Sequence, residues 1–161
     1  MCRIRQFEMA DADRLKQITV EAFDGVSIAH NIEKQFGAIH GRDWQWRKAR
    51  EIDDDIGKDP EGIFVAEINS LVVGYVTTWI DADTGMGYIP NLAVDSQYRG
   101  HGLGKKLLKR AISRFSADQI THARIETLEQ NEVGQSLYPS LGFQPVARQV
   151  HYCLQIEKVA G

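Results

Sequence analysis

The chain has 161 residues, of which 43% are hydrophobic and 25% are charged, and its formal net charge is −3. This composition lies in the ordinary globular range and excludes an intrinsically disordered chain, while the small negative charge argues against nucleic-acid binding through overall charge. We therefore expect one folded domain over residues 1–161.

The N-terminal part alternates between strand-like and helical patterns. Residues 2–7 form a short strand-like run, and apolar residues at three- and four-residue spacings predict a helix over 10–23. Residues 24–42 are rich in Gly and His, have no steady period and are predicted as a loop, before a second helix over 43–56. One face of that second helix is expected to carry Trp44, Lys48, Ile52 and Ile56.

The middle of the chain is rich in β-branched and aromatic residues. The runs 63–68 and 71–80 flank Asn69 and Ser70, which predicts two antiparallel strands joined by a tight turn. A further strand is expected over 88–94. Because Pro90 cannot donate to a strand ladder, this strand is predicted to be irregular or bulged.

The rest of the chain continues the mixture of helices and strands. An apolar stripe predicts an amphipathic helix over 103–115, followed by a strand over 122–128 and a helix over 131–137. Residues 146–156 are expected to form a final pair of strand pieces. The order of elements therefore indicates an α/β (α+β) fold.

The most informative segment is a glycine-rich turn, residues 97–106, which separates the strand 88–94 from the helix 103–115. Glycines allow close approach of the backbone to a ligand, and the free N–H groups of a helix N-terminus favour an anion. Residues 61–96 contain five acids and no Lys or Arg, whereas residues 97–117 contain six Lys or Arg and no acid. The turn is predicted to bind phosphate, although the basic helix residues also fit an ordinary solvated face.

Two common nucleotide fingerprints do not fit this turn. The GxGxxG pattern requires glycine or alanine where Lys105 stands, and the P-loop pattern requires glycine at Arg99 and Ser or Thr at Lys106. A nucleotide-binding protein with an unusual loop is therefore the least favoured alternative.

The pattern Gln97-x-x-Gly100-x-Gly102 resembles the signature of the Gcn5-related N-acetyltransferase (GNAT) family, whose loop holds the pyrophosphate of acetyl-coenzyme A (acetyl-CoA). Residues 91–94 are similar to the family's bulged fourth strand, and Asn131 with Tyr138 is similar to its next motif. The resemblance covers nearly the whole chain. It implies a mixed, mostly antiparallel central sheet, flanked by helices and splayed at the bulged fourth strand.

The resemblance further implies that acetyl-CoA is the co-substrate and that no metal is needed. The residues implied to contact it lie in the bulged strand, the glycine-rich turn and the later motif. They are Leu92, Ala93, Val94, Gln97, Arg99, Gly100, His101, Gly102, Leu103, Gly104, Lys105, Asn131 and Tyr138.

Acyl transfer from a thioester to an amine needs an oxyanion donor, a general acid and a general base. The resemblance implies the backbone N–H of Leu92 as the oxyanion donor. Tyr138 is the candidate acid, since the ordinary pKa of tyrosine, about 10, suits a departing thiolate. It also fits a packing residue, and Pro139 after it disfavours helical geometry.

Glu126 is the candidate base. It stands five residues before Asn131 and twelve before Tyr138, a spacing that resembles the branch of the family acetylating protein N-termini. A solvent-facing strand carboxylate is an equal alternative, and a chain of water molecules leading to Glu126 serves as well as direct deprotonation. Neither cysteine has a His positioned to make it a nucleophile, so direct transfer in a ternary complex is expected.

The acceptor is left open between a small amine, an amino acid, an antibiotic and a protein N-terminus. The acidic run 53–55 is able to attract a cationic amine, but such a run is usually a solvated face. A non-catalytic CoA-binding or sensor domain is the main alternative function. Dimers are common in the family, so a homodimer is compatible with the resemblance.

The cysteines and the N-terminus indicate the compartment. Cys2 and Cys153 lack a CxxC spacing, which argues against a zinc cluster or a disulfide framework, and no apolar run resembling a signal peptide follows Met1. We therefore expect a cytoplasmic protein without a metal site, membrane span or nucleic-acid partner.

Overall fold

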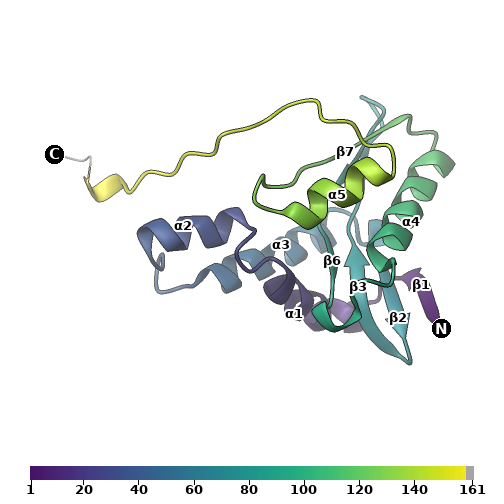
Figure 1. The fold of residues 1–161 in the computed structure, drawn as a ribbon, viewed down its shortest axis with the longest axis horizontal. Helices are drawn as coiled ribbons and strands as arrows, with labels where there is room; N and C mark the ends of the chain where they lie inside the picture. The colour runs from purple at the N-terminus through teal and green to yellow at the C-terminus, as the bar shows by residue number, and fades with distance from the viewer. Residues whose placement is uncertain (159–161) are drawn as a thin grey trace.

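The computed structural model describes residues 1–158. Figure 1 shows α4 and α5 on one side of the strands and α1, α2 and α3 on the other. The helices are α1 (Ala12–Ala22), α2 (Ile28–Phe36), α3 (Trp44–Lys58), α4 (Leu103–Ala117) and α5 (Glu132–Ser140). The strands are β1 (Cys2–Gln6), β2 (Phe64–Ile68), β3 (Leu71–Val76), β4 (Trp79–Asp81), β5 (Met86–Ile89), β6 (Leu92–Val94) and β7 (His122–Ile125).

The strands form two sheets that separate at Pro90 and Asn91. The larger sheet is antiparallel, in the order β1-β2-β3-β6, and the smaller sheet has the order β4-β5-β7. The pair β4/β5 is antiparallel, whereas β5/β7 is parallel. The expected mixed, mostly antiparallel sheet with a break at Pro90 is therefore confirmed.

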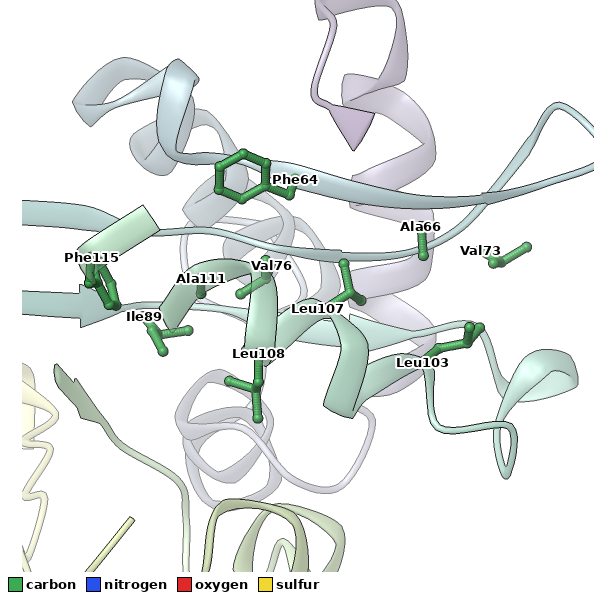
Figure 2. Packing of buried hydrophobic residues seen from close by; sticks show 10 residues of the cluster. All are labelled: Phe64, Ala66, Val73, Val76, Ile89, Leu103, Leu107, Leu108, Ala111 and Phe115. Carbon is green, nitrogen blue, oxygen red and sulfur yellow. The ribbon is translucent and has the colours of Figure 1, made fainter. Parts of the chain in front are cut away.

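Alternation along the strands divides the core between the two faces of the sheet. Phe64 and Ala66 of β2 pack with the apolar stripe of α4, as Figure 2 shows, while Val65 between them packs with α1 and α3. Fully burying one Leu or Ile side chain contributes roughly 1.5–3 kcal/mol. The side chains of α4 in this core are Leu103, Leu107, Leu108, Ala111 and Phe115.

The expected loop over 24–42 is wrong in part, because it contains helix α2. The hydroxyl of Ser27 accepts a hydrogen bond from the His30 N–H, and the helix ends at Gly37, whose φ is +78°. Ile28, Ile32 and Phe36 stand four residues apart and form an apolar stripe on α2, although none of its residues is fully buried. This short stripe was the signal that the expected loop overlooked. Helix α3 follows the expectation, with Asp43 capping the N–H of Trp46 and Trp44 buried.

Asn69 and Ser70 form the expected tight turn, both with positive φ. The strand predicted over 71–80 is interrupted between Val76 and Trp79, and the strand predicted over 122–128 ends at Ile125. The two halves of the predicted strand 71–80 pair with different strands, β3 with β6 and β4 with β5. The local sequence pattern does not show where a strand changes its pairing partner. No helix in the described part of the chain is long and apolar enough to cross a membrane.

The strand pieces expected over 146–156 are wrong. Residues 144–155 have no regular secondary structure, and a short 3-10 helix (Ile156–Lys158) follows them. Figure 1 shows this part of the chain leaving the sheets and passing beyond α2. The sequence has an alternating strand pattern, but within the described residues it has no neighbouring strand to pair with.

Candidate active site

Within residues 1–158, β6 pairs only with β3, and its other edge presents a backbone amide at the point where the two sheets separate. The Asn91 carbonyl accepts from the Thr77 N–H at 2.9 Å, and the Asp95 N–H donates to the Val73 carbonyl at 2.8 Å. Alternate residues of an antiparallel strand direct their backbone groups to the same neighbour. The N–H of Leu92 therefore points away from β3, toward the open edge.

The glycine-rich turn follows directly after β6. Asp95 Oδ1 accepts the Gln97 N–H at 2.9 Å and caps a 3-10 turn over Ser96–Tyr98. Gly100 and Gly102 then have φ values of +81° and +73°, a region that side chains disfavour. The N-cap residue of α4 is Gly102, which has no side chain to accept hydrogen bonds from the helix. The first N–H groups of α4 therefore point toward the turn without a partner from the cap residue.

The predicted cofactor residues of this turn differ in what they present. Ala93 and Leu103 are buried in the core, so only their backbone groups are able to contact a ligand. Arg99 Nε donates to the Val94 carbonyl at 3.2 Å, which folds this side chain back over β6. Side chains or backbone atoms are exposed at Gln97, Arg99, Gly100, His101, Gly102 and Lys105.

Gly104 has a structural reason of its own. A Cβ atom at this position would lie 3.2 Å from Leu137 Cδ2. This glycine therefore allows α4 and α5 to approach closely, which brings the later motif next to the turn.

Tyr138 lies in α5, and the helix continues through Pro139 to Ser140. Burial raises the pKa of the Tyr138 hydroxyl to about 12. Its ring meets Phe143 edge-on, with the centroids 6.1 Å apart. The side chain is thus both a packing residue and a protonated hydroxyl at neutral pH, and the proline does not remove it from the helix.

Asn131 caps α5, with Oδ1 accepting the Gly134 N–H at 3.3 Å. The bond uses the carbonyl oxygen and not Nδ2, so the amide keeps its two donors for other partners. Asn131 therefore has a clear structural role beside the cofactor contact that the resemblance implies.

Glu126 follows the end of β7 and is solvent-facing, with a side chain 63% exposed. Arg124 donates to its Oε1 from Nε at 3.1 Å and from Nη2 at 2.8 Å. The same guanidinium lies 5.4 Å from the ring of Tyr88, which stacks on Trp79 at 4.0 Å. This row of side chains crosses the smaller sheet on the side opposite to α4.

Sequence reasoning missed a hydrogen-bonded cluster behind β6. Asp55 Oδ2 accepts from Asn91 Nδ2 and from the Thr77 hydroxyl, both at 2.8 Å, and Lys48 Nζ donates to Asn91 Oδ1 at 3.1 Å. Burial raises the pKa of Asp55. The expectation that residues 53–55 are all a solvated face is wrong for Asp55. Its seven-residue spacing from Lys48, two helical turns, was the available signal.

A second missed contact joins the loop after β7 to α2. Gln130 Nε2 donates to the Gly25 carbonyl at 2.6 Å and to Asn31 Oδ1 at 2.9 Å, and Asn31 Nδ2 donates back to Gln130 Oε1 at 3.1 Å. A cavity of about 370 Å³ lies beside this contact. Its walls are α2, residues 128–130 and residues 149–153. The loop that follows β7 and contains Glu126 is therefore hydrogen-bonded to α2 and to the segment before it.

Comparisons with known proteins identify the family and the fold. Residues 26–143 match the family model described as the acetyltransferase (GNAT) family. The chain is 40% identical over 103 residues to N-alpha-acetyltransferase 30 of Saccharomyces cerevisiae, covering 59% of this chain and 58% of that protein. It is 30% identical over 122 residues to mycothiol acetyltransferase of Streptomyces avermitilis, covering 76% of this chain and 37% of that protein. The matched part thus spans 58% of the length of the yeast relative and 37% of the length of the mycothiol acetyltransferase.

Solved structures share the fold at low sequence identity. The PaiA N-acetyltransferase of Thermoplasma acidophilum, in complex with coenzyme A, has a TM-score of 0.69 at 20% identity, covering 89% of this chain and 90% of that chain. The ribosomal-protein-S18-alanine N-acetyltransferase of Escherichia coli has a TM-score of 0.67 at 20% identity, covering 97% and 86%.

Proposed function

Because the chain belongs to the acetyltransferase (GNAT) family, we propose that it transfers the acetyl group of acetyl-CoA to a primary amine by direct attack in a ternary complex. The observation that supports this most is the pairing of two backbone features along one short stretch. The outward-facing N–H of Leu92 is followed, ten residues later, by the N-terminus of α4, where the N-cap residue, Gly102, has no side chain to accept the first N–H groups. The first suits a thioester carbonyl and the second suits a pyrophosphate.

The shape of the turn fits a pyrophosphate. A Cβ atom added at Gly100 or Gly102 would meet nothing within 4 Å, so open space lies over the backbone there. In our proposal acetyl-CoA lies along the open edge of β6, with its pyrophosphate on the N–H groups of the turn. Lys105 adds positive charge beside it, and Arg99 adds a second charge when its side chain leaves the Val94 carbonyl. The Asn131 amide contacts the pantetheine arm.

The proposed reaction assigns one role to each of three groups. Glu126, directly or through water, takes one proton from the acceptor ammonium, and the neutral amine nitrogen then attacks the thioester carbonyl carbon. The Leu92 N–H stabilises the oxyanion, and the C–S bond then breaks. Tyr138 donates its proton to the departing thiolate and is reprotonated by the second proton of the acceptor nitrogen. Burial, which raises its pKa to about 12, keeps it protonated but makes it a weaker acid than an ordinary tyrosine. Before the acceptor enters, the Glu126 carboxylate is hydrogen-bonded to Arg124. The acceptor ammonium therefore competes with the Arg124 guanidinium for this carboxylate.

We propose a protein N-terminus as the acceptor. The spacing of Glu126, Asn131 and Tyr138 supports this class, as do relatives named for N-alpha-acetylation. A small amine is the second candidate, since other relatives are named mycothiol acetyltransferases.

The test is thiol release from acetyl-CoA with a matched panel of acceptors. The panel contains three groups of acceptors. They are peptides with free N-termini, the same peptides with a blocked N-terminus and one added lysine, and small amines. We expect release with free N-termini and none with the blocked set. Release with small amines alone contradicts the acceptor class, and binding of acetyl-CoA without release across the panel supports the non-catalytic alternative.

Several expectations from the sequence stay predictions. They are the single domain over residues 1–161, the cytoplasmic location, and function without metal, membrane or nucleic acid.

A further inference from the structure

The two sheets separate at Thr77 and Asn91, which face each other across the break. The Thr77 N–H donates to the Asn91 carbonyl at 2.9 Å, as in a regular antiparallel ladder. The Asn91 N–H instead donates to the Thr77 hydroxyl at 3.0 Å, where a regular ladder would use the Thr77 carbonyl. A side chain therefore makes one of the two hydrogen bonds that join the strands at the break.

Asp55 of α3 holds the side chains of this pair. Its Oδ2 accepts from the Thr77 hydroxyl and from Asn91 Nδ2, both at 2.8 Å. Lys48, two helical turns earlier in α3, donates to Asn91 Oδ1 at 3.1 Å. Asn91 is only 4% exposed, and its N–H, its carbonyl and both polar atoms of its side chain have partners. The position of Asn91 is therefore set from two directions, by Thr77 and by α3.

The hydrogen bonds of Asn91 determine the direction of the next amide. The Asn91 carbonyl and the Leu92 N–H belong to one planar trans peptide unit, so they point in opposite directions. Because the carbonyl is bound to Thr77, the Leu92 N–H points to the open edge of β6. A rotation of this peptide unit would turn the proposed oxyanion donor away from the thioester oxygen.

The strand itself gives this peptide unit little support. Pro90, just before Asn91, has no N–H to donate and is exposed. Strand β6 is three residues long and, in the described chain, has β3 as its one neighbour. A short strand next to a break has few backbone bonds to keep its orientation. The hydrogen bonds from α3 therefore supply the rigidity that the ladder lacks.

We propose that Asp55 is a positioning residue for acyl transfer, which orients the Leu92 N–H through Thr77 and Asn91. This inference rests on the proposed function, in which that N–H stabilises the oxyanion. Asp55 lies behind β6 and acts only through the two residues that it holds. Its loss is therefore expected to lower kcat, while the glycine-rich turn still binds acetyl-CoA.

The first test is infrared difference spectroscopy of bound acetyl-CoA with an isotope label at the thioester carbonyl carbon. A hydrogen bond from Leu92 lowers the stretching frequency of this carbonyl, and the measurement needs no acceptor. We expect a lowered frequency in the parent and in Asp55→Asn, because an amide oxygen is able to accept the same two bonds. Lys48 keeps its ion pair with Glu51 in that variant. In Asp55→Ala we expect the frequency to return toward that of free acetyl-CoA.

The results of this test separate the positioning role from the proposed function. A lowered frequency that persists unchanged in folded Asp55→Ala overturns the positioning role alone. A parent that does not bind acetyl-CoA, or that binds it without a lowered frequency, contradicts the proposed function. The positioning role then fails with it.

The second test measures kcat and the Kd for acetyl-CoA, with the peptide that gives the fastest thiol release in the parent. We expect kcat to fall by about 10-fold or more in Asp55→Ala, with Kd unchanged and kcat largely retained in Asp55→Asn. The control is Asp11→Ala. Asp11 is also buried and accepts two hydrogen bonds from Arg5, but Arg5 lies in β1, which β2 and β3 separate from β6.

The control separates positioning from general stability. Asp11→Ala is expected to lower the thermal stability and to leave kcat unchanged, because its ion pair is remote from the break. Equal losses of kcat in Asp55→Ala and Asp11→Ala show a merely structural role and overturn the proposal. So does an Asp55→Asn variant that loses as much kcat as Asp55→Ala.

If Asp55→Ala does not fold, the Thr77 hydroxyl provides the same test. Thr77→Val removes both the bond to Asp55 and the bond from the Asn91 N–H, whereas Thr77→Ser keeps a hydroxyl. We expect the lower kcat and the higher carbonyl frequency in Thr77→Val, and values close to those of the parent in Thr77→Ser. A Thr77→Val variant with the kcat and the frequency of the parent overturns the proposal.

Discussion

Arg124 donates two hydrogen bonds to the same oxygen of Glu126, from Nε at 3.1 Å and from Nη2 at 2.8 Å. Arg124 lies opposite Tyr88 in the β5/β7 ladder, and both side chains of the ion pair are more than half exposed. An exposed pair of this kind contributes little to stability, because solvent screens the two charges. Its importance therefore lies in the position it gives the Glu126 carboxylate.

The first prediction concerns Glu126. Replacing Glu126 by Gln removes the proton acceptor, so kcat falls by about 10²-fold or more, while the Kd for acetyl-CoA is unchanged. Steady-state kinetics and calorimetry measure the two effects. The matched control is Glu129→Gln, because Glu129 is also exposed and paired with an arginine, Arg148. Equal losses in both variants exclude Glu126 as the base.

The second prediction concerns the acid. Tyr138→Phe keeps the ring against Phe143 but removes the hydroxyl, so kcat falls by about 10²-fold with little change in thermal stability. The raised pKa of Tyr138 means that its donor form persists up to about pH 12. The parent therefore loses no activity through Tyr138 near pH 10, and an alkaline limb there that Tyr138→Phe abolishes contradicts this assignment.

The third prediction concerns the support of Tyr138. A Cβ at Gly134 would lie 2.8 Å from Thr127 Oγ1 and 3.1 Å from Tyr138 Cε2. Gly134→Ala is therefore expected to lower the free energy of unfolding by about 1–3 kcal/mol and to lower kcat. Without this clash, replacing a helical glycine by alanine usually raises the free energy of unfolding. Gly57→Ala in α3 is the control, since nothing lies within 4 Å, and it is expected to stabilise by about 0.4–1 kcal/mol. Denaturant unfolding measures both, and a stabilising Gly134→Ala contradicts the packing described.

The fourth prediction concerns stability at acid pH. Burial alone would raise the pKa of Asp95, but hydrogen bonds from the Gln97 amide and from Arg14 lower it further than burial raises it. A lowered folded pKa gives stability that is present above the unfolded value of 3.8 and is lost as the pH falls below it.

Asp95→Asn is therefore expected to lower the free energy of unfolding by about 1–3 kcal/mol at pH 7, with the deficit shrinking below about pH 4. Asp83→Asn, an exposed change in the turn between β4 and β5, is the control and leaves the profile unchanged. Urea unfolding at a series of pH values measures this. A deficit that stays constant from pH 7 to pH 3 contradicts the linkage.

Features set by local chemistry were predictable from the sequence. The glycine-rich turn was predictable because Gly100 and Gly102 adopt positive φ immediately before a helix, where few other residues do so. The apolar faces of α3 and α4 were predictable from helical spacing alone. The break at Pro90 followed from its missing N–H.

Features set by distant pairing were not predictable. The contact of Arg124 with Glu126 beside Tyr88 depends on the parallel register of β5 and β7, which no local pattern reports. Helix α2 was predictable in principle, because Ile28, Ile32 and Phe36 recur every four residues, but the stripe spans only nine residues and lies among Gly and His. The segment 144–156 has the pattern of a strand, but whether it pairs depends on where an open edge lies.

The most direct test of the account is calorimetric titration of acetyl-CoA into the parent, Gly102→Glu and Gly37→Glu. Both glycines have positive φ, +73° at Gly102 and +78° at Gly37, and the two variants add the same charge. Gly37 has ψ of −171°, a region that side chains disfavour more than the left-handed helical conformation of Gly102, so the control carries at least as much backbone strain. We expect the parent and Gly37→Glu to bind acetyl-CoA and folded Gly102→Glu to lose binding by at least about 10²-fold. No binding by the folded parent, or equal binding by Gly102→Glu, contradicts the assignment of the glycine-rich turn as the pyrophosphate site.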